Sequence, residues 1–319
     1  MPKKALPKFA IGFSALAGCY VLLSLVAGIT LAELSLHLPR HRVSQEYRLF
    51  AYQRAKAIDA ALVDIQITAK DGTTLRAWFA TPHLGNGSTV LLLHGVTDNR
   101  IGVSGYAEFF LRHGYSVLLP DMRGHGESGG VLATYGLREA DDVRRWIAWI
   151  RQNQSPQCVF GFGESMGAGI LLQSLDRQAN FCAVVAESPF ADFREGVTDR
   201  VVNKLHSQSE LARLASQLPI SFGLIYARIR YRLNFSDVSP RNVVSHSGVP
   251  VLLIHGMADT NLLPRNSEMI HRDNLAETEL WEVPGAEHCG AWSTAPVEFE
   301  KRVLDWFRTH NRQPRLPWA

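Results

Sequence analysis

Short apolar runs recur along most of the chain, and segments with helical periodicity separate them. Continuous apolar runs are typical of strands that are buried on both faces of a parallel sheet. Strands are predicted at 88–93, 115–120, 159–164, 182–186, 250–254 and 278–283. Helices are predicted at 103–112, 137–151, 166–176, 264–272 and 296–309. This alternation predicts an α/β fold, a doubly wound and mostly parallel sheet with helices on both faces.

Two parts of the chain depart from this alternation. Residues 63–68 and 74–80 flank the turn sequence Asp71-Gly72, which predicts an antiparallel hairpin at the edge of the sheet. The roughly 60 residues between 188 and 249 carry helical patterning and an aromatic, basic segment. An insertion of this size above the strand ends is typical of a lid, which we place at about 190–245.

The N-terminal segment is apolar enough to cross a membrane. Residues 9–32 contain no charged side chain. At about 1.5 Å per residue, a helix of this length spans a hydrocarbon core of about 30 Å. Lys3, Lys4 and Lys8 precede the run, which favours a cytoplasmic N-terminal tip and a folded domain on the non-cytoplasmic side. We therefore predict a single transmembrane signal-anchor.

Three alternatives remain for this segment. One is a cleavable signal peptide, although its apolar region is normally about 7–15 residues long. Another is a lipoprotein signal, because Leu16-Ala17-Gly18-Cys19 resembles a lipobox with Cys19 as the acylated residue; the apolar run, however, continues past it. The third is a buried core helix. Arg40, Arg42 and Arg48 follow the run closely and reduce the charge bias that sets its orientation.

A polar, basic stretch links this segment to the folded region. Residues 39–60 interleave Tyr47, Phe50 and Tyr52 with basic residues. This composition predicts either a juxtamembrane linker near lipid headgroups or an ordinary surface helix. The predicted organisation is a tip and anchor at 1–38, a linker at 39–60, an α/β domain at 61–311 and a tail at 312–319.

Composition excludes several classes of protein. With 46% hydrophobic and 20% charged residues the chain is a folded globular protein, and a net charge of +3 is too small to indicate nucleic-acid binding. Cys19, Cys158, Cys182 and Cys289 show no paired spacing, so we expect neither a disulfide framework nor a zinc site, and interpret them as small buried or half-buried residues. No histidine pair has metal-ligand spacing beside carboxylates, so no metal is expected.

One short motif carries the chemistry. Gly163-Glu164-Ser165-Met166-Gly167 follows an apolar run and precedes a small-residue segment suited to a helix. Strand, sharp turn and helix in this order form a nucleophile elbow, where flanking glycines permit a strained turn that presents the serine hydroxyl. Ser165 is therefore the predicted nucleophile.

An acid and a base occur later in the chain, each after a predicted strand. Asp259 and His288 follow Ser165 in the order nucleophile, acid, base, and the strand ends of a parallel sheet meet along one edge. His288 would take the proton of Ser165, and Asp259 would fix the tautomer of His288 and stabilise the imidazolium. The residues weighed as alternatives are Glu187 and Asp192 for the acid and His255 for the base.

Backbone groups complete the predicted site. His94-Gly95-Val96 follows an earlier strand, so the N–H of Val96 can pair with that of Met166, the residue after the nucleophile. Both would donate to the oxyanion that develops during attack. His94 is interpreted as a structural brace for this turn, and Glu164 and Cys289 are neighbours of the site without a predicted role.

These motifs together resemble those of α/β-hydrolase-fold serine hydrolases, in the family's order and over nearly all of the chain after the linker. The matching segments are His94-Gly95, Asp121-x-Arg123-Gly124-x-Gly126-x-Ser128, Gly163-x-Ser165-x-Gly167, His255-Gly256-x-x-Asp259 and His288. Within the family the chain is similar to esterases, acyl hydrolases and serine-aminopeptidase-like members. The resemblance implies that 121–128 is a structural loop beside the pocket.

The sequence thus predicts a membrane-anchored serine hydrolase that cleaves a carboxylic ester or thioester through an acyl-enzyme on Ser165. The expected substrate is a small or lipid-like acyl compound, with no cofactor, no metal and no nucleic-acid partner. The alternatives are a serine peptidase or amidase acting on short peptides, and a catalytically silent hydrolase-fold module that binds at the membrane.

Overall fold

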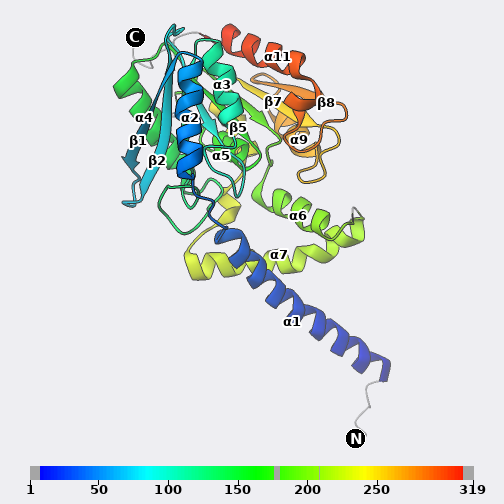
Figure 1. Ribbon diagram of the computed structural model, residues 1–319. Helices are drawn as coiled ribbons and strands as arrows, with labels where there is room; N and C mark the ends of the chain where they lie inside the picture. The colour runs from blue at the N-terminus through cyan, green and yellow to red at the C-terminus, as the bar shows by residue number, and fades with distance from the viewer. Residues whose placement is uncertain (1–7, 176–179, 208, 312–319) are drawn as a thin grey trace, which may run out of the picture.

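An eight-stranded sheet forms the centre of the computed structural model (Figure 1), which describes residues 8–175, 180–207 and 209–311. The strand order is β1-β2-β4-β3-β5-β6-β7-β8. The strands are β1 (Ala60–Thr68), β2 (Thr74–Pro82), β3 (Thr89–Leu93), β4 (Ser116–Pro120), β5 (Val159–Glu164), β6 (Ala183–Glu187), β7 (Val251–Gly256) and β8 (Thr278–Val283). Strands β3 to β8 run parallel, while β1 and β2 form an antiparallel hairpin at one edge. The predicted fold class is confirmed.

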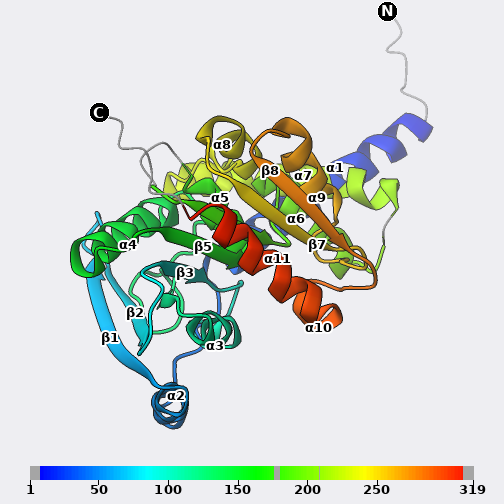
Figure 2. The same cartoon turned by 90° about the horizontal axis from the view of Figure 1, so that it is seen from above.

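Helices cover both faces because the inner strands are apolar on both sides. In β3, Leu92 packs with one set of helices and Leu91 with the opposite set. The first set is α3 (Ser104–Arg112), α10 (Ala291–Thr294) and α11 (Pro296–Thr309). The second is α4 (Glu139–Gln154), α5 (Met166–Gln173), α8 (Pro240–Ser247) and α9 (Arg265–Asp273). Viewed from above, the two sets lie on either side of the sheet (Figure 2).

The segment between β6 and β7 is helical. It contains α6 (Phe193–Lys204), α7 (Glu210–Tyr231), the 3₁₀ turn η1 (Phe235–Asp237) and α8. Helices α6 and α7 lie at one end of the α/β domain, where α7 crosses the first helix of the chain, α1 (Lys8–Leu36) (Figure 1). This is the segment that the sequence predicts as a lid. The predicted tail, 312–319, lies outside the described residues.

Helix α1 packs against α7 and projects from the domain (Figure 1). The two backbones meet at Gly28 and Gly223, where a Cβ on Gly223 would lie 2.7 Å from the Gly28 carbonyl oxygen. Small residues allow such close approach in membrane helices. Glu33 of α1 also accepts hydrogen bonds from Tyr226 (2.6 Å) and Tyr231 (2.7 Å). These contacts fix the C-terminal half of α1. Residues 14–36 are apolar enough to span a membrane, and only 17% of the most apolar 18-residue stretch among them is buried.

Helix α2 (Gln45–Ala57) occupies most of the predicted linker. Ser44 caps its N-terminus, and Arg48 forms ion pairs with Asp64 and Glu127 of the α/β domain. Tyr52 donates a hydrogen bond to the same Asp64. Helix α2 is therefore held on the surface of the domain.

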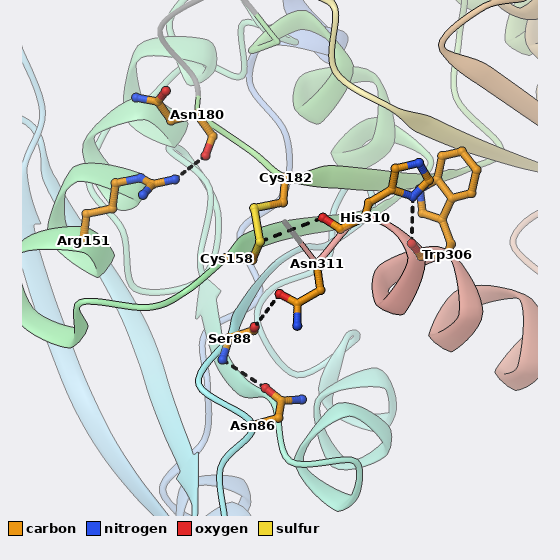
Figure 3. Close-up of a disulfide and its surroundings, with 9 residues drawn as sticks. All are labelled: Asn86, Ser88, Arg151, Cys158, Asn180, Cys182, Trp306, His310 and Asn311. Atoms are coloured by element: carbon orange, nitrogen blue, oxygen red, sulfur yellow. Dashed lines mark hydrogen bonds between the residues drawn. A yellow bond between two sulfur atoms is a disulfide. The ribbon is translucent and has the colours of Figure 1, made fainter. Parts of the chain in front are cut away.

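The expectation that the cysteines form no disulfide is wrong for two of the four. Cys158 and Cys182 form a disulfide with a Cα–Cα distance of 5.7 Å (Figure 3). They stand directly before β5 and β6, neighbouring parallel strands whose register brings their starts side by side. The 24-residue separation along the chain gave no sign of this, because pairing depends on which strands are neighbours and on their register. Cys19 and Cys289 are free.

Candidate active site

The turn between β5 and α5 holds Ser165 in a strained conformation. Its backbone has φ 51° and ψ −116°, a region that non-glycine residues rarely adopt. The neighbouring glycines allow the chain to fold back on itself. A Cβ on Gly163 would lie 2.7 Å from the Gly167 carbonyl oxygen, and one on Gly167 would collide with the carbonyl oxygen of Leu93 in β3. The sequence motif therefore forms the sharp strand–turn–helix geometry that a nucleophile elbow requires.

Of the three predicted triad residues, His288 lies within hydrogen-bond distance of both Ser165 and Asp259. The Nε2 atom of His288 lies 2.8 Å from Oγ of Ser165, and its Nδ1 atom lies 2.6 Å from Oδ2 of Asp259. Asp259 follows β7 and His288 follows β8, so adjacent strand ends position both groups beside the elbow. With Nδ1 protonated toward Asp259, Nε2 is free to accept the proton of the hydroxyl.

The surroundings of Asp259 keep it ionised. Burial would raise its pKa, but hydrogen bonds from His255 and His288 and from the backbone N–H of Leu262 outweigh burial and hold the pKa well below its usual range. The N–H of Asn261 also donates to Oδ1, at 2.8 Å. A fully charged carboxylate is what the orienting member of a triad requires.

The residues weighed as alternatives have other partners. Glu187 accepts hydrogen bonds from Tyr106 and from the N–H of Ala291, and Asp192 accepts one from Ser239. His255 is fully buried, with Nδ1 2.7 Å from the Ser267 hydroxyl. Its Nε2 atom lies near the Leu262 carbonyl and Asp259. The ring of His255 braces Asp259 rather than facing Ser165.

The predicted oxyanion donors flank Ser165. Met166 is the first residue of α5, a position whose N–H has no acceptor within the helix, and Val96 lines the same cavity as Ser165 and Met166. His94 stands behind the Val96 turn. Its Nδ1 lies 2.8 Å from the Gly95 carbonyl oxygen, and its Nε2 accepts the N–H of Met122 at 3.1 Å. Burial lowers the pKa of His94 to about 4, so the ring is neutral and acts as a brace.

A pair of carboxyl groups beside the candidate triad, one half-buried and one fully buried, was not foreseen from the sequence. Glu164 at the end of β5 and Glu187 at the end of β6 are register partners, and Tyr106 bonds to Glu187 at 3.0 Å. Burial, together with the charges of Glu187 and Asp98, raises the pKa of Glu164 to about 8. Burial also raises the pKa of Glu187. The only feature of the sequence that could have indicated this pair is that both glutamates end predicted strands, one of them directly before Ser165.

Glu164→Gln is expected to flatten the pH dependence of stability. The folded-state pKa of Glu164 is raised, so its contribution is fully present below the unfolded value of about 4.5 and is lost as pH rises through about 8. Glutamine cannot ionise. The difference in melting temperature between the variant and wild type should therefore shift in favour of the variant between pH 5 and pH 9. At about 1.4 kcal/mol per pKa unit, the corresponding change in relative stability is a few kcal/mol.

The matched control for this prediction is Glu282→Gln, an exposed glutamate in β8. Its melting curve should follow wild type at every pH. Thermal melts of all three proteins at pH 5, 7 and 9 measure the difference. A Glu164→Gln curve parallel to wild type would show that Glu164 carries no raised pKa.

A cavity of about 370 Å³ opens over Ser165. Most of its lining is apolar and comes from four parts of the chain: the C-terminal end of α1, the β3–α3 loop, the turn after β5 and helix α6. The lining includes Leu31, Leu34, Leu38, Val96, Ser165, Met166, Phe190, Phe193, Val197, Arg200, Val201, Lys204, Leu205 and Leu262. No Asp or Glu is among the described residues that line it. Among the described residues, no group of three or more His, Cys, Asp and Glu side chains is placed to hold a metal ion.

Known proteins share this architecture. A family model described as serine aminopeptidase, S33, matches residues 86–239. The uncharacterized protein YqkD of Bacillus subtilis is 28% identical over 243 residues, 75% of this chain and 77% of its own length. The lysophosphatidylserine lipase ABHD12 of Danio rerio is 30% identical over 190 residues, 57% of this chain and 46% of its own. The esterase Pf2001 of Pyrococcus furiosus superposes with a TM-score of 0.66 and 25% identity, covering 86% of this chain and 98% of its own.

Proposed function

We propose that the chain is a serine hydrolase of the α/β-hydrolase fold that cleaves carboxylic ester or thioester bonds of acyl substrates through an acyl-enzyme on Ser165. The observation that carries this proposal is the contact of His288 with both Ser165 Oγ (2.8 Å) and Asp259 Oδ2 (2.6 Å), beneath an apolar cavity. Such a contact supports a catalytic enzyme over the silent binding module.

The proposed reaction has two halves. Oγ of Ser165 attacks the acyl carbon while His288 takes its proton, and the N–H groups of Val96 and Met166 donate to the resulting oxyanion. The bond to the leaving oxygen or sulfur then breaks, and His288 protonates the leaving group. In the second half His288 removes a proton from water, which attacks the acyl-enzyme. The acid leaves, and the proton returns to Ser165.

The lining of the cavity favours acyl esters over peptides. An aminopeptidase must hold the positive α-amino group of its substrate, for which a carboxylate is the natural partner. The described lining has no carboxylate and two cations, Arg200 and Lys204. Peptide or amide cleavage remains the second candidate, because the matching family model is described as a serine aminopeptidase. The esterase and lipase relatives favour the first.

We also propose that α1 anchors the enzyme in a membrane, with the α/β domain on the non-cytoplasmic side. Its apolar composition and low burial fit a span, and Lys8 begins the helix on the side expected to be cytoplasmic. The disulfide between Cys158 and Cys182 supports this orientation, since such bonds persist in oxidising compartments. In this arrangement the segment 190–245 is the lid, 61–311 is the catalytic domain and 39–60 connects it to the anchor.

One experiment separates the candidate functions. The wild-type protein in detergent is expected to react with a fluorophosphonate probe and to hydrolyse p-nitrophenyl esters, with aminoacyl p-nitroanilides turned over at least about tenfold more slowly. Faster turnover of the amides would identify a peptidase. A folded protein that neither binds the probe nor hydrolyses either substrate would be a silent module.

A further inference from the structure

The active-site cavity is partly built by the helix that is also the membrane span. Leu31, Leu34 and Ser35, at the C-terminal end of α1, line the cavity that contains Ser165, and so does Leu38 just after the helix. A smaller cavity between α1, α6 and α7 is lined by Leu31 and Ser35 as well. The end of α1 is held in this position, because the hydroxyl of Tyr135 bonds to the Ser35 carbonyl at 2.7 Å. A helix that served only as a tether would not need to form a wall of the substrate site.

Helix α7 leaves an apolar face uncovered beside α1. Leu211, Leu214, Ile225 and Ile229 are 76%, 71%, 53% and 77% exposed. Leu218 and Phe222 fill the interval between them, so the six side chains recur every three or four residues along one face of the helix. Water-exposed helices of globular proteins do not present such a face. Because α7 packs against α1, the covering that this face needs is the lipid around α1.

The cavity also carries positive charge. Arg200 and Lys204 lie one turn apart on α6, line the cavity and are exposed. Neither forms an ion pair with another described residue, whereas Arg213 and Arg265 nearby are paired with Asp199 and Glu195. Unpaired cations next to an apolar surface are typical of side chains at the level of lipid phosphates.

We propose that α7 lies in the surface layer of the bilayer that α1 spans, and that the substrate is an amphiphile whose acyl chain enters the cavity from the lipid along the end of α1. This inference rests on the proposed function. Arg200 and Lys204 then lie at the headgroup layer, and Leu31 and Leu34 contact the chain as it passes from lipid to protein. The chain reaches Ser165 without crossing water.

The wall of the cavity can be tested by filling it. In the full-length protein in vesicles of phosphatidylcholine and phosphatidylglycerol, Leu31→Trp is expected to lower kcat/KM for a long-chain monoacylglycerol by about tenfold or more. The loss in kcat/KM for p-nitrophenyl acetate, which has no long chain to accommodate, should be several-fold smaller, so the ratio of the two losses reports the blocked path of the chain. The matched control is Leu22→Trp, at an exposed position on the same helix away from the cavity. This variant should leave the hydrolysis of both substrates unchanged.

The immersion of α7 is tested with a second variant. Leu214→Glu together with Ile229→Glu is expected to lower vesicle hydrolysis by about tenfold or more and to leave p-nitrophenyl acetate hydrolysis and membrane retention unchanged. Fluorophosphonate labelling reports that each variant is folded. Equal effects of Leu31→Trp and Leu22→Trp, equal losses on both substrates, or full vesicle activity of the α7 variant would overturn the inference. Absence of labelling in the wild type would instead overturn the proposed function.

Discussion

Replacing Ser165 by alanine is expected to lower kcat/KM for a p-nitrophenyl ester by on the order of 10⁵-fold, because no other group can form the acyl-enzyme. The hydroxyl oxygen is the atom that His288 contacts, and the strained turn at Ser165, with φ 51°, presents it to the cavity. The residual rate should come from the oxyanion donors and from binding alone. Steady-state kinetics and fluorophosphonate labelling measure the loss, and labelling should disappear completely.

A buried serine in the following helix provides the control. Ser174 caps α5, and its hydroxyl donates to the Leu171 carbonyl at 2.6 Å, away from the cavity. Ser174→Ala should keep activity within about twofold and lose a little stability. If Ser165→Ala retained labelling, the nucleophile would be a different residue, and the proposed mechanism would be wrong.

The convergence of the three candidate triad residues could be predicted from the sequence because the sheet is parallel. Ser165, Asp259 and His288 each follow an apolar run, and parallel strands end along one edge. Order along the chain was therefore enough to expect the three side chains to meet, without knowledge of the strand register. The strand and helix boundaries followed from the same apolar patterns, and β8 (Thr278–Val283) and α11 (Pro296–Thr309) begin and end where the sequence predicts.

Contacts that depend on strand register or on the packing partner of a helix could not be predicted from the sequence. The disulfide and the Glu164–Glu187 pair both join β5 to β6, and each requires knowing that these strands are neighbours and how they align. The wall formed by α1 is a different case. A leucine that faces lipid and a leucine that faces a substrate cavity give the same apolar pattern, so Leu31 carried no signal of its position.

Replacing Asp259 by asparagine should lower kcat by on the order of 10⁴-fold at neutral pH while leaving the fold intact. The amide oxygen can still accept the N–H groups of Asn261 and Leu262. The amide nitrogen, however, then faces Nδ1 of His288, which favours the tautomer with the proton on Nε2. That proton points at Ser165, so the ring cannot act as a base.

The same substitution changes how stability depends on pH. The pKa of Asp259 is held below its usual value, so its stabilising contribution is present above an unfolded pKa of about 3.8 and is lost as pH falls further. Asp259→Asn should therefore be less stable than wild type at pH 7, with a deficit that narrows below about pH 4. Asp305→Asn, at an exposed ion pair with Lys301, should match wild type in both activity and pH dependence. If Asp259→Asn kept more than about a tenth of wild-type activity, and Glu187→Gln then abolished it, the acid of the triad would be Glu187, reached by a movement of the ring of His288.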